Sequence, residues 1–163
     1  MEEPKSSTAI DLVHSIDHDL RGNAARVWSK GRSLAQGGHG FTSDEQRNVL
    51  EMVDSHLDQL LNAAYRLTLW IDAQHSDSLT IVRPIQNVEQ VLGWTPLELL
   101  RHVDHEMARS LPVVRKVAHD LVSGQYGFTS EDQKDRLHLL YRDVERLQTV
   151  VEVIHVWLTK NAP

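Results

Sequence analysis

Apolar residues recur at intervals of three and four positions along four long stretches of the chain. This heptad spacing is typical of helices that bury one narrow stripe against neighbours crossing at about 20°. Glycine and proline are rare within the stretches, and the segment from Ser43 to Ser78 contains neither, which favours unbroken helices. The four stripes are Val13, Ile16, Leu20, Ala24, Val27, Gly31 and Leu34; Leu50, Val53, Leu57, Leu60, Ala64, Leu67 and Ile71; Leu100, Val103, Met107, Leu111, Val114, Ala118 and Leu121; and Leu137, Leu140, Val144, Leu147, Val151, Ile154 and Leu158.

Residues typical of helix termini bound these stretches. Ser43 and Ser130 each precede a glutamine by three positions, which is the spacing of a capping box. Thr95 precedes a proline and, three positions later, Glu98, a pattern that also begins helices. We therefore expect helices over residues 8–36, 44–73, 96–123 and 131–160, each about 43 Å long at a rise of about 1.5 Å per residue.

The second half of the chain repeats the first. The block from Gly37 to Ser43 recurs from Gly124 to Ser130, a displacement of 87 positions. The same displacement, without a gap, relates the apolar stripes of the two halves and carries His18 onto His105. Self-similarity of this kind predicts two copies of one supersecondary unit.

The repeat and the stripes together predict an all-α fold. Residues 1–73 and 96–163 each form an antiparallel helical hairpin, and the two hairpins bury all four stripes in one four-helix bundle with a pseudo-twofold axis. A homodimer that uses the same stripes is the alternative. Residues 74–95 form the linker, in which we expect a short extended piece at 79–84 and a short helix within 85–92.

Composition narrows the possible function classes. The chain has 163 residues, a net charge of -6 and no cysteine. The acidic balance disfavours nucleic acid as a partner, and the lack of cysteine excludes disulfides, thiol nucleophiles and thiolate metal sites. No apolar run reaches the roughly 18 residues that span a bilayer, and the polar N-terminus lacks a signal-peptide core. We therefore expect no membrane association and a cytoplasmic location.

Two histidines occupy equivalent positions away from the apolar stripes. Steps of 100° per residue place His18 about 150° and His105 about 160° from their stripes, on the solvent side of each helix. An acidic residue follows each of them, Asp19 in the first half and Glu106 in the second. A neutral imidazole is a nucleophile at about pH 7, and an adjacent carboxylate stabilises its charged form.

The residues around the first histidine resemble those of a known family. The tetrapeptide His18-Asp19-Leu20-Arg21 resembles the H-box of sensor histidine kinases, and residues 41–61 resemble the second helix of the same domain. This is the dimerization and histidine-phosphotransfer domain, a helical hairpin that dimerises into a four-helix bundle. The resemblance covers residues 10–73 and, more weakly, 97–160, so that the chain resembles two such hairpins in tandem.

The resemblance implies a role for each candidate residue. His18 accepts a phosphoryl group, and Asp19 orients or deprotonates its imidazole. His105 and Glu106 are the corresponding pair in the second copy. Arg21 lies on a neighbouring face of the helix, where its guanidinium can steady an anionic phosphoryl group or a partner.

The chain departs from the family at several positions. Gly22 replaces the Asn or Thr that usually follows the histidine by four residues, and Pro112 should kink the third long helix. No nucleotide-binding domain follows the second hairpin, so we expect no ATP-dependent autokinase activity. We expect no bound cofactor and no metal site in the protein itself; magnesium would come only from a receiver domain.

These observations favour a histidine phosphotransfer protein of two-component signalling, which carries a phosphoryl group between a histidine and a receiver-domain aspartate. The expected partners are a response-regulator receiver domain, a histidine kinase or both, with a homodimer possible. The alternative is a non-catalytic adaptor or inhibitor that binds either partner through a degenerate bundle. A metal-binding bundle is a third hypothesis, which rests on the pairs His14 and His18, His102 and His105, and Glu152 and His155.

The large aromatic residues have simpler expected roles. Phe41 and Phe128 follow the two glycine-rich loops, where we expect each to fill the end of the bundle. Trp70 and Trp157 lie at equivalent positions beside the apolar stripes, where packing in the core or at the bundle end is expected.

Overall fold

The computed structural model describes residues 6–36, 40–41, 43–75 and 88–161. These residues form five α-helices and no strand, which confirms the all-α prediction. The four long helices begin and end within two residues of the expected positions, whereas the extended piece expected at 79–84 lies outside the described residues. The helices are α1 (Ser6–Ala35), α2 (Asp44–His75), α3 (Val88–Leu92), α4 (Pro96–Val122) and α5 (Glu131–Asn161).

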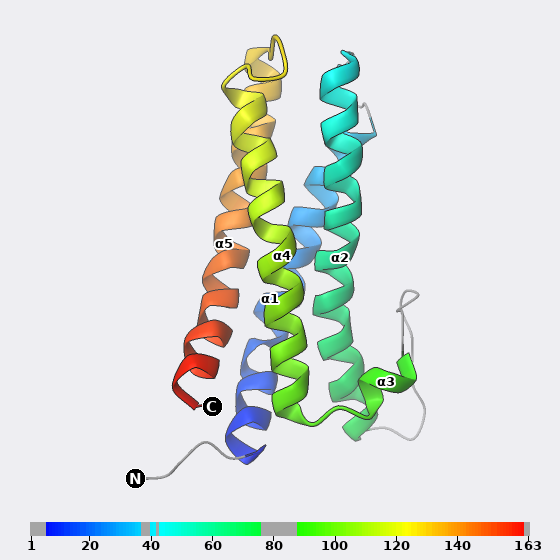
Figure 1. The fold of residues 1–163 in the computed structure, drawn as a ribbon, viewed down its shortest axis with the longest axis vertical. Coiled ribbons are helices and arrows are strands. Elements are labelled where there is room, and N and C mark those ends of the chain that lie inside the picture. Colours follow the sequence, from blue (N-terminus) through cyan, green and yellow to red (C-terminus); the bar gives the residue numbers. More distant parts are fainter. Residues whose placement is uncertain (1–5, 37–39, 42, 76–87, 162–163) are drawn as a thin grey trace.

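The four long helices pack side by side as a helical bundle (Figure 1). Helix α1 packs against α2 and α5, and α4 packs against the same two helices, while α1 and α4 also touch across the interior. The starts of α1 and α4 lie at one end of the bundle together with α3, and the starts of α2 and α5 lie at the other (Figure 1). No helix in the described part of the chain combines the length and apolar character needed to cross a membrane.

The predicted stripes form the core. Of their members, Ile71 alone is not buried. The adjacent Trp70 is buried in its place, and its indole N–H donates to the backbone carbonyl of Trp94 at 2.9 Å. Because the segment at α3 packs against this end of α2, the helix buries a wider face here than the heptad pattern predicts.

The predicted helix caps are present. Thr95 and Glu98 form a complete capping box at the start of α4, and Ser130 and Gln133 exchange the same two hydrogen bonds at the start of α5. At the start of α2, the Ser43 hydroxyl accepts from the backbone N–H of Gln46. These contacts satisfy backbone donors that a helix leaves unpaired, which explains why the sequence located the helix starts closely.

The two predicted aromatic plugs differ in the structure. Phe41 is buried as expected, but Phe128 is 85% exposed, so its predicted role was wrong. Thr129 takes the buried position instead, and its hydroxyl donates to the carbonyl of Leu121 at 2.6 Å. The Gln46 amide also donates to the Phe128 carbonyl at 2.8 Å, so this backbone is held toward the bundle while the ring lies outside.

Polar contacts also join α1 to α5. The Lys30 ammonium of α1 pairs with the carboxylate of Asp143 on α5, a side chain that is almost fully buried. Arg146 lies 3.7 Å from the same carboxylate. A buried carboxylate is tolerated only when it is paired, so these contacts help to define how α5 sits against α1.

One ion pair makes stability depend on pH. The Lys116 ammonium donates to Asp120 at 2.7 Å and holds the pKa of that carboxyl below its usual range. A lowered carboxyl pKa stabilises the fold above the ordinary pKa of about 4, and this contribution disappears as the pH falls through the lowered value.

We therefore expect Asp120→Asn to lower the free energy of unfolding more at about pH 7 than at about pH 2. Urea denaturation of both proteins at the two pH values measures the difference. Asp135→Asn, which changes an exposed aspartate of α5, is the matched control. An Asp120→Asn effect that is equal at both pH values would contradict the assignment.

Candidate functional site

His18 lies near the middle of α1 with its side chain exposed, as its distance from the apolar stripe predicts. Asp19, the next residue, is also exposed, and Arg21 is half-buried on the neighbouring face. The helix buries Leu20 between them, so its rotation about its own axis is fixed by the core. An imidazole on such a helix is presented to solvent at a defined place without needing a loop.

A hydrogen bond between helices fixes the backbone beside His18. The Thr68 hydroxyl of α2 donates to the carboxylate of Asp17 at 2.7 Å. Asp17 directly precedes His18, so this contact joins α1 to α2 at the level of the candidate site. The Asp17 carboxylate is therefore engaged in a hydrogen bond between helices. Asp19 is the exposed acid that follows His18.

Gly22 leaves open space one helical turn after His18. A Cβ atom built at Gly22 would have one neighbour within 4 Å, the Arg26 guanidinium nitrogen Nη1 at 3.9 Å. Residues four apart share a helix face, so this space adjoins the imidazole of His18. The missing side chain widens the approach to the histidine at the cost of helix stability, because glycine is a poor helix former.

Gly22→Ala is therefore expected to stabilise the protein by about 0.5–1 kcal/mol and to raise Tm by roughly 1–4 °C. Gly40→Ala is the contrasting variant, because Gly40 has a φ of 81° that alanine adopts only with strain. Thermal unfolding followed by circular dichroism measures both. A lower Tm for Gly22→Ala would mean that the open space beside His18 is not as described.

The second histidine has a different environment. His105 is exposed on α4, as predicted, and Glu106 is half-buried beside it. Asp104, which directly precedes His105, lies 3.3 Å from Nδ1 of His155 on α5. This contact joins α4 to α5 at the level of His105, as the Asp17 contact joins α1 to α2 at the level of His18.

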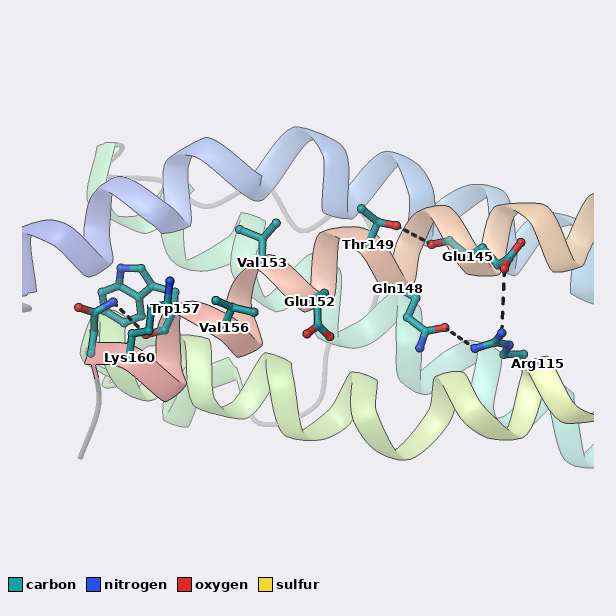
Figure 2. Close-up of a pocket in the computed structure, with 10 residues that line it drawn as sticks. Arg115, Glu145, Gln148, Thr149, Glu152, Val153, Val156, Trp157 and Lys160 are labelled. Atoms are coloured by element: carbon teal, nitrogen blue, oxygen red, sulfur yellow. Dashed lines mark hydrogen bonds and ion pairs between the residues drawn. The ribbon is translucent and has the colours of Figure 1, made fainter.

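A surface hollow along α5 contains neither His18 nor His105. It has a volume of about 790 Å³ and lies along α5, with Val153, Val156 and Trp157 toward one end (Figure 2). At the other end, Arg115 of α4 donates to Gln148 at 3.3 Å (Figure 2). Trp157 is half-buried in this hollow and packs against the core, in agreement with its expected packing role.

The proposed metal pairs do not come together into a larger cluster. Among the described residues, no three His, Asp or Glu side chains are grouped so that they could hold a metal ion. Two members of the pairs have other contacts: His102 stacks on Trp94 with 3.9 Å between ring centroids, and His155 contacts Asp104.

The first candidate site is thus an exposed imidazole, an adjacent carboxylate and a nearby guanidinium on one rigid helix. This set can supply a nucleophile, stabilise its charged form and hold an anionic group. Sequence reasoning located His18, Asp19 and Arg21 from their order along the chain, but the Thr68 contact requires the fold. No protein-family model, curated protein sequence or solved structure matches the chain.

Proposed function

We propose that this protein is a histidine phosphotransfer carrier of two-component signalling, with His18 as its first phosphoacceptor. The observation that carries the proposal is the exposure of His18 on a helix whose rotation and position are fixed by Leu20 and the Asp17–Thr68 hydrogen bond. Phosphoryl transfer depends mainly on in-line positioning and charge stabilisation, so a carrier needs an accessible, well-placed imidazole more than a deep pocket.

The transfer step uses groups of this chain and one aspartyl phosphate on the partner. The lone pair of the unprotonated imidazole nitrogen attacks phosphorus, the P–O bond to the partner's aspartate breaks, and the aspartate leaves as a carboxylate. The imidazole keeps the proton on its other nitrogen and becomes a phosphorylated imidazolium. Asp19 stabilises this cation or accepts its proton, and Arg21 steadies the phosphoryl oxygens.

We further propose that the two hairpins are tandem copies related by a pseudo-twofold axis. Pairs of contacting residues in the first half recur as contacting pairs 87 positions later, which supports this proposal. Asp17 meets Thr68 in the first hairpin, and Asp104 meets His155 in the second. The indole of Trp28 donates to Asp58 at 2.9 Å, and at the corresponding positions Arg115 lies 4.0 Å from Glu145.

The loops support the same relation between the hairpins. A Cβ atom at Gly40 would lie 3.5 Å from the amide nitrogen of Gln133, and one at Gly127 would lie 4.0 Å from that of Gln46. Each loop therefore meets the capping glutamine of the other hairpin. Glycine is favourable at both sites, since Gly40 and Gly127 have φ values of 81° and 109°.

Within this duplicated arrangement, we assign His18 as the first acceptor and His105 as the second. Ala108 occupies the position that corresponds to Arg21, so the second site departs from the H-box pattern around His18, and its cation is Arg109, four residues after His105. Glu106 is half-buried, whereas Asp19 is exposed. The residues around His18 therefore match the H-box more fully than those around His105, and on this ground His18 is assigned first.

Incubation with phosphorylated receiver domains encoded in the same genome tests the proposal. We expect the protein to acquire phosphate that is labile in acid and stable in base, the behaviour of a phosphoramidate. Tight binding to a receiver or a histidine kinase without labelling would refute the carrier and favour a non-catalytic adaptor. Neither labelling nor binding with any of these partners would refute both.

A further inference from the structure

A polar pocket of about 360 Å³ lies between α2 and α4, away from His18. Helix α2 lines it with Asn62 and Arg66, and α4 lines it with Glu106 and Arg109. The volume falls in the range of small-molecule sites, which commonly lie between the helices of a bundle. The polar pocket is therefore large enough for a compact ligand.

An aromatic pair forms one wall of the polar pocket. The Trp94 ring stacks on His102 with 3.9 Å between centroids and an interplanar angle of 7°. The backbone of Trp94 is held in turn by the Trp70 indole, which donates to its carbonyl. This wall is thus built by the connection after α3 and is anchored to the core.

Two buried polar atoms of residues that line the polar pocket have no hydrogen-bond partner within the described residues. They are the side-chain oxygen Oδ1 of Asn62 and the guanidinium nitrogen Nε of Arg66. Such atoms are rare in folded proteins because they lose hydration without replacing it. Arg66 Nε is a donor and Asn62 Oδ1 is an acceptor, and both are covered, so a ligand with an acceptor and a donor satisfies them only when these side chains turn toward the polar pocket.

The charged side chains of the polar pocket restrict the class of ligand further. Two guanidiniums, of Arg66 and Arg109, favour a carboxylate, which accepts paired hydrogen bonds from arginine. The carboxylate of Glu106 lines the same small volume and favours a cationic donor over a neutral one. A ligand that carries a carboxylate and a neighbouring ammonium matches both requirements.

The two arginines of the polar pocket are a feature of one groove of the bundle and not of the corresponding one. In the corresponding groove between α5 and α1, a displacement of 87 positions replaces Asn62, Arg66 and Arg109 by Thr149, Val153 and Gly22. The two arginines therefore have no counterparts there, so the bundle architecture alone does not require them.

We propose that the polar pocket binds a free α-amino acid, whose carboxylate pairs with Arg66 and Arg109 and whose ammonium pairs with Glu106, while the side chain of Asn62 turns to meet the ligand. The inference does not depend on phosphoryl transfer at His18, although Glu106 is also the acid proposed to assist His105. It gives the groove between α2 and α4 a ligand-binding role that neither candidate phosphoacceptor supplies.

Titration of the intact protein with each standard amino acid, followed through the Nε–H cross-peak of Arg66 in ¹H–¹⁵N spectra, tests the proposal. The best ligand is then compared with its α-hydroxy acid and its deaminated acid, which keep the same side chain. We expect a saturable shift, with the deaminated acid at least about tenfold weaker because it lacks the donor. No saturable shift with any amino acid, or equal affinity for the deaminated acid, would overturn the proposal.

Variants separate this site from general anion binding. Arg66→Gln and Arg109→Gln are each expected to weaken binding at least about tenfold by calorimetry. Arg142→Gln, which removes an exposed arginine of α5 outside the polar pocket, should bind as the unmodified protein does. Arg109 is itself exposed, so its variant should fold even if Arg66→Gln does not. Unchanged binding by Arg109→Gln, or equal loss in Arg142→Gln, would overturn the assignment.

Discussion

His18→Gln is expected to reduce phosphoryl labelling by a phosphorylated receiver domain to the background level. Glutamine keeps a polar side chain at this exposed position but has no nucleophilic ring nitrogen, so the P–N bond cannot form. Surface substitutions of this kind usually change stability by no more than about 0.5 kcal/mol, so the fold should persist. Quantitative labelling, with circular dichroism as the check on folding, measures the effect.

His105→Gln is the matched control, since it makes the same change at the corresponding exposed position. We expect it to keep most of the labelling, and Asp19→Asn to slow labelling without abolishing it, because the carboxylate assists a nucleophile that remains. Full labelling of His18→Gln together with loss in His105→Gln would reverse the assignment of the two sites.

Gly31→Ala is expected to destabilise the bundle by about 1–2 kcal/mol, although alanine is the better helix former. Gly31 lies in the buried stripe of α1, where an added Cβ would be 2.5 Å from Cδ1 and 3.3 Å from Cγ of Leu57. Leu57 is fully buried, so it cannot move aside without disturbing its own neighbours. Urea denaturation at constant pH gives the free energy of unfolding.

The sequence repeat indicates how this overpacking can be relieved. A displacement of 87 positions relates Gly31 and Leu57 to Ala118 and Val144, both buried, so under the proposed duplication one methyl-sized group has changed sides. We therefore expect the double variant Gly31→Ala/Leu57→Val to lose less unfolding free energy than the two single variants lose in sum. The expected difference, which is the coupling energy, is about 1 kcal/mol. Additive effects would contradict this packing relation.

The heptad pattern predicted most of the fold because it reports burial directly. Residues such as Val27 and Leu147 are apolar because they lie in the core. The intervals between successive apolar residues of this kind are those of one face of a helix. Ser130 and Thr95 marked helix starts through local hydrogen bonds that need no tertiary information. Phe128 was mispredicted because an apolar residue after a loop does not reveal which of two neighbours, Phe128 or Thr129, points inward.

The polar pocket could not be predicted in the same way. Asn62 and Arg66 on α2, like Glu106 and Arg109 on α4, have the spacing of an ordinary solvated helix face. Their partial enclosure depends on α2 packing beside α4 and on Trp94, which lies between α3 and α4 and outside the heptad pattern of the long helices. The sequence does show one pair of polar residues at helical spacing on α2 and another on α4. These pairs indicate a pocket only when α2 and α4 are known to be neighbours.

Localisation of the phosphoryl group on the unmodified protein tests the central claim most directly. After transfer from a phosphorylated receiver domain, tandem mass spectrometry under neutral to basic conditions should find one phosphoryl group on the peptide that contains His18, attached to that imidazole. A phosphoryl group on a serine, threonine or carboxylate, or on neither histidine, would contradict the account.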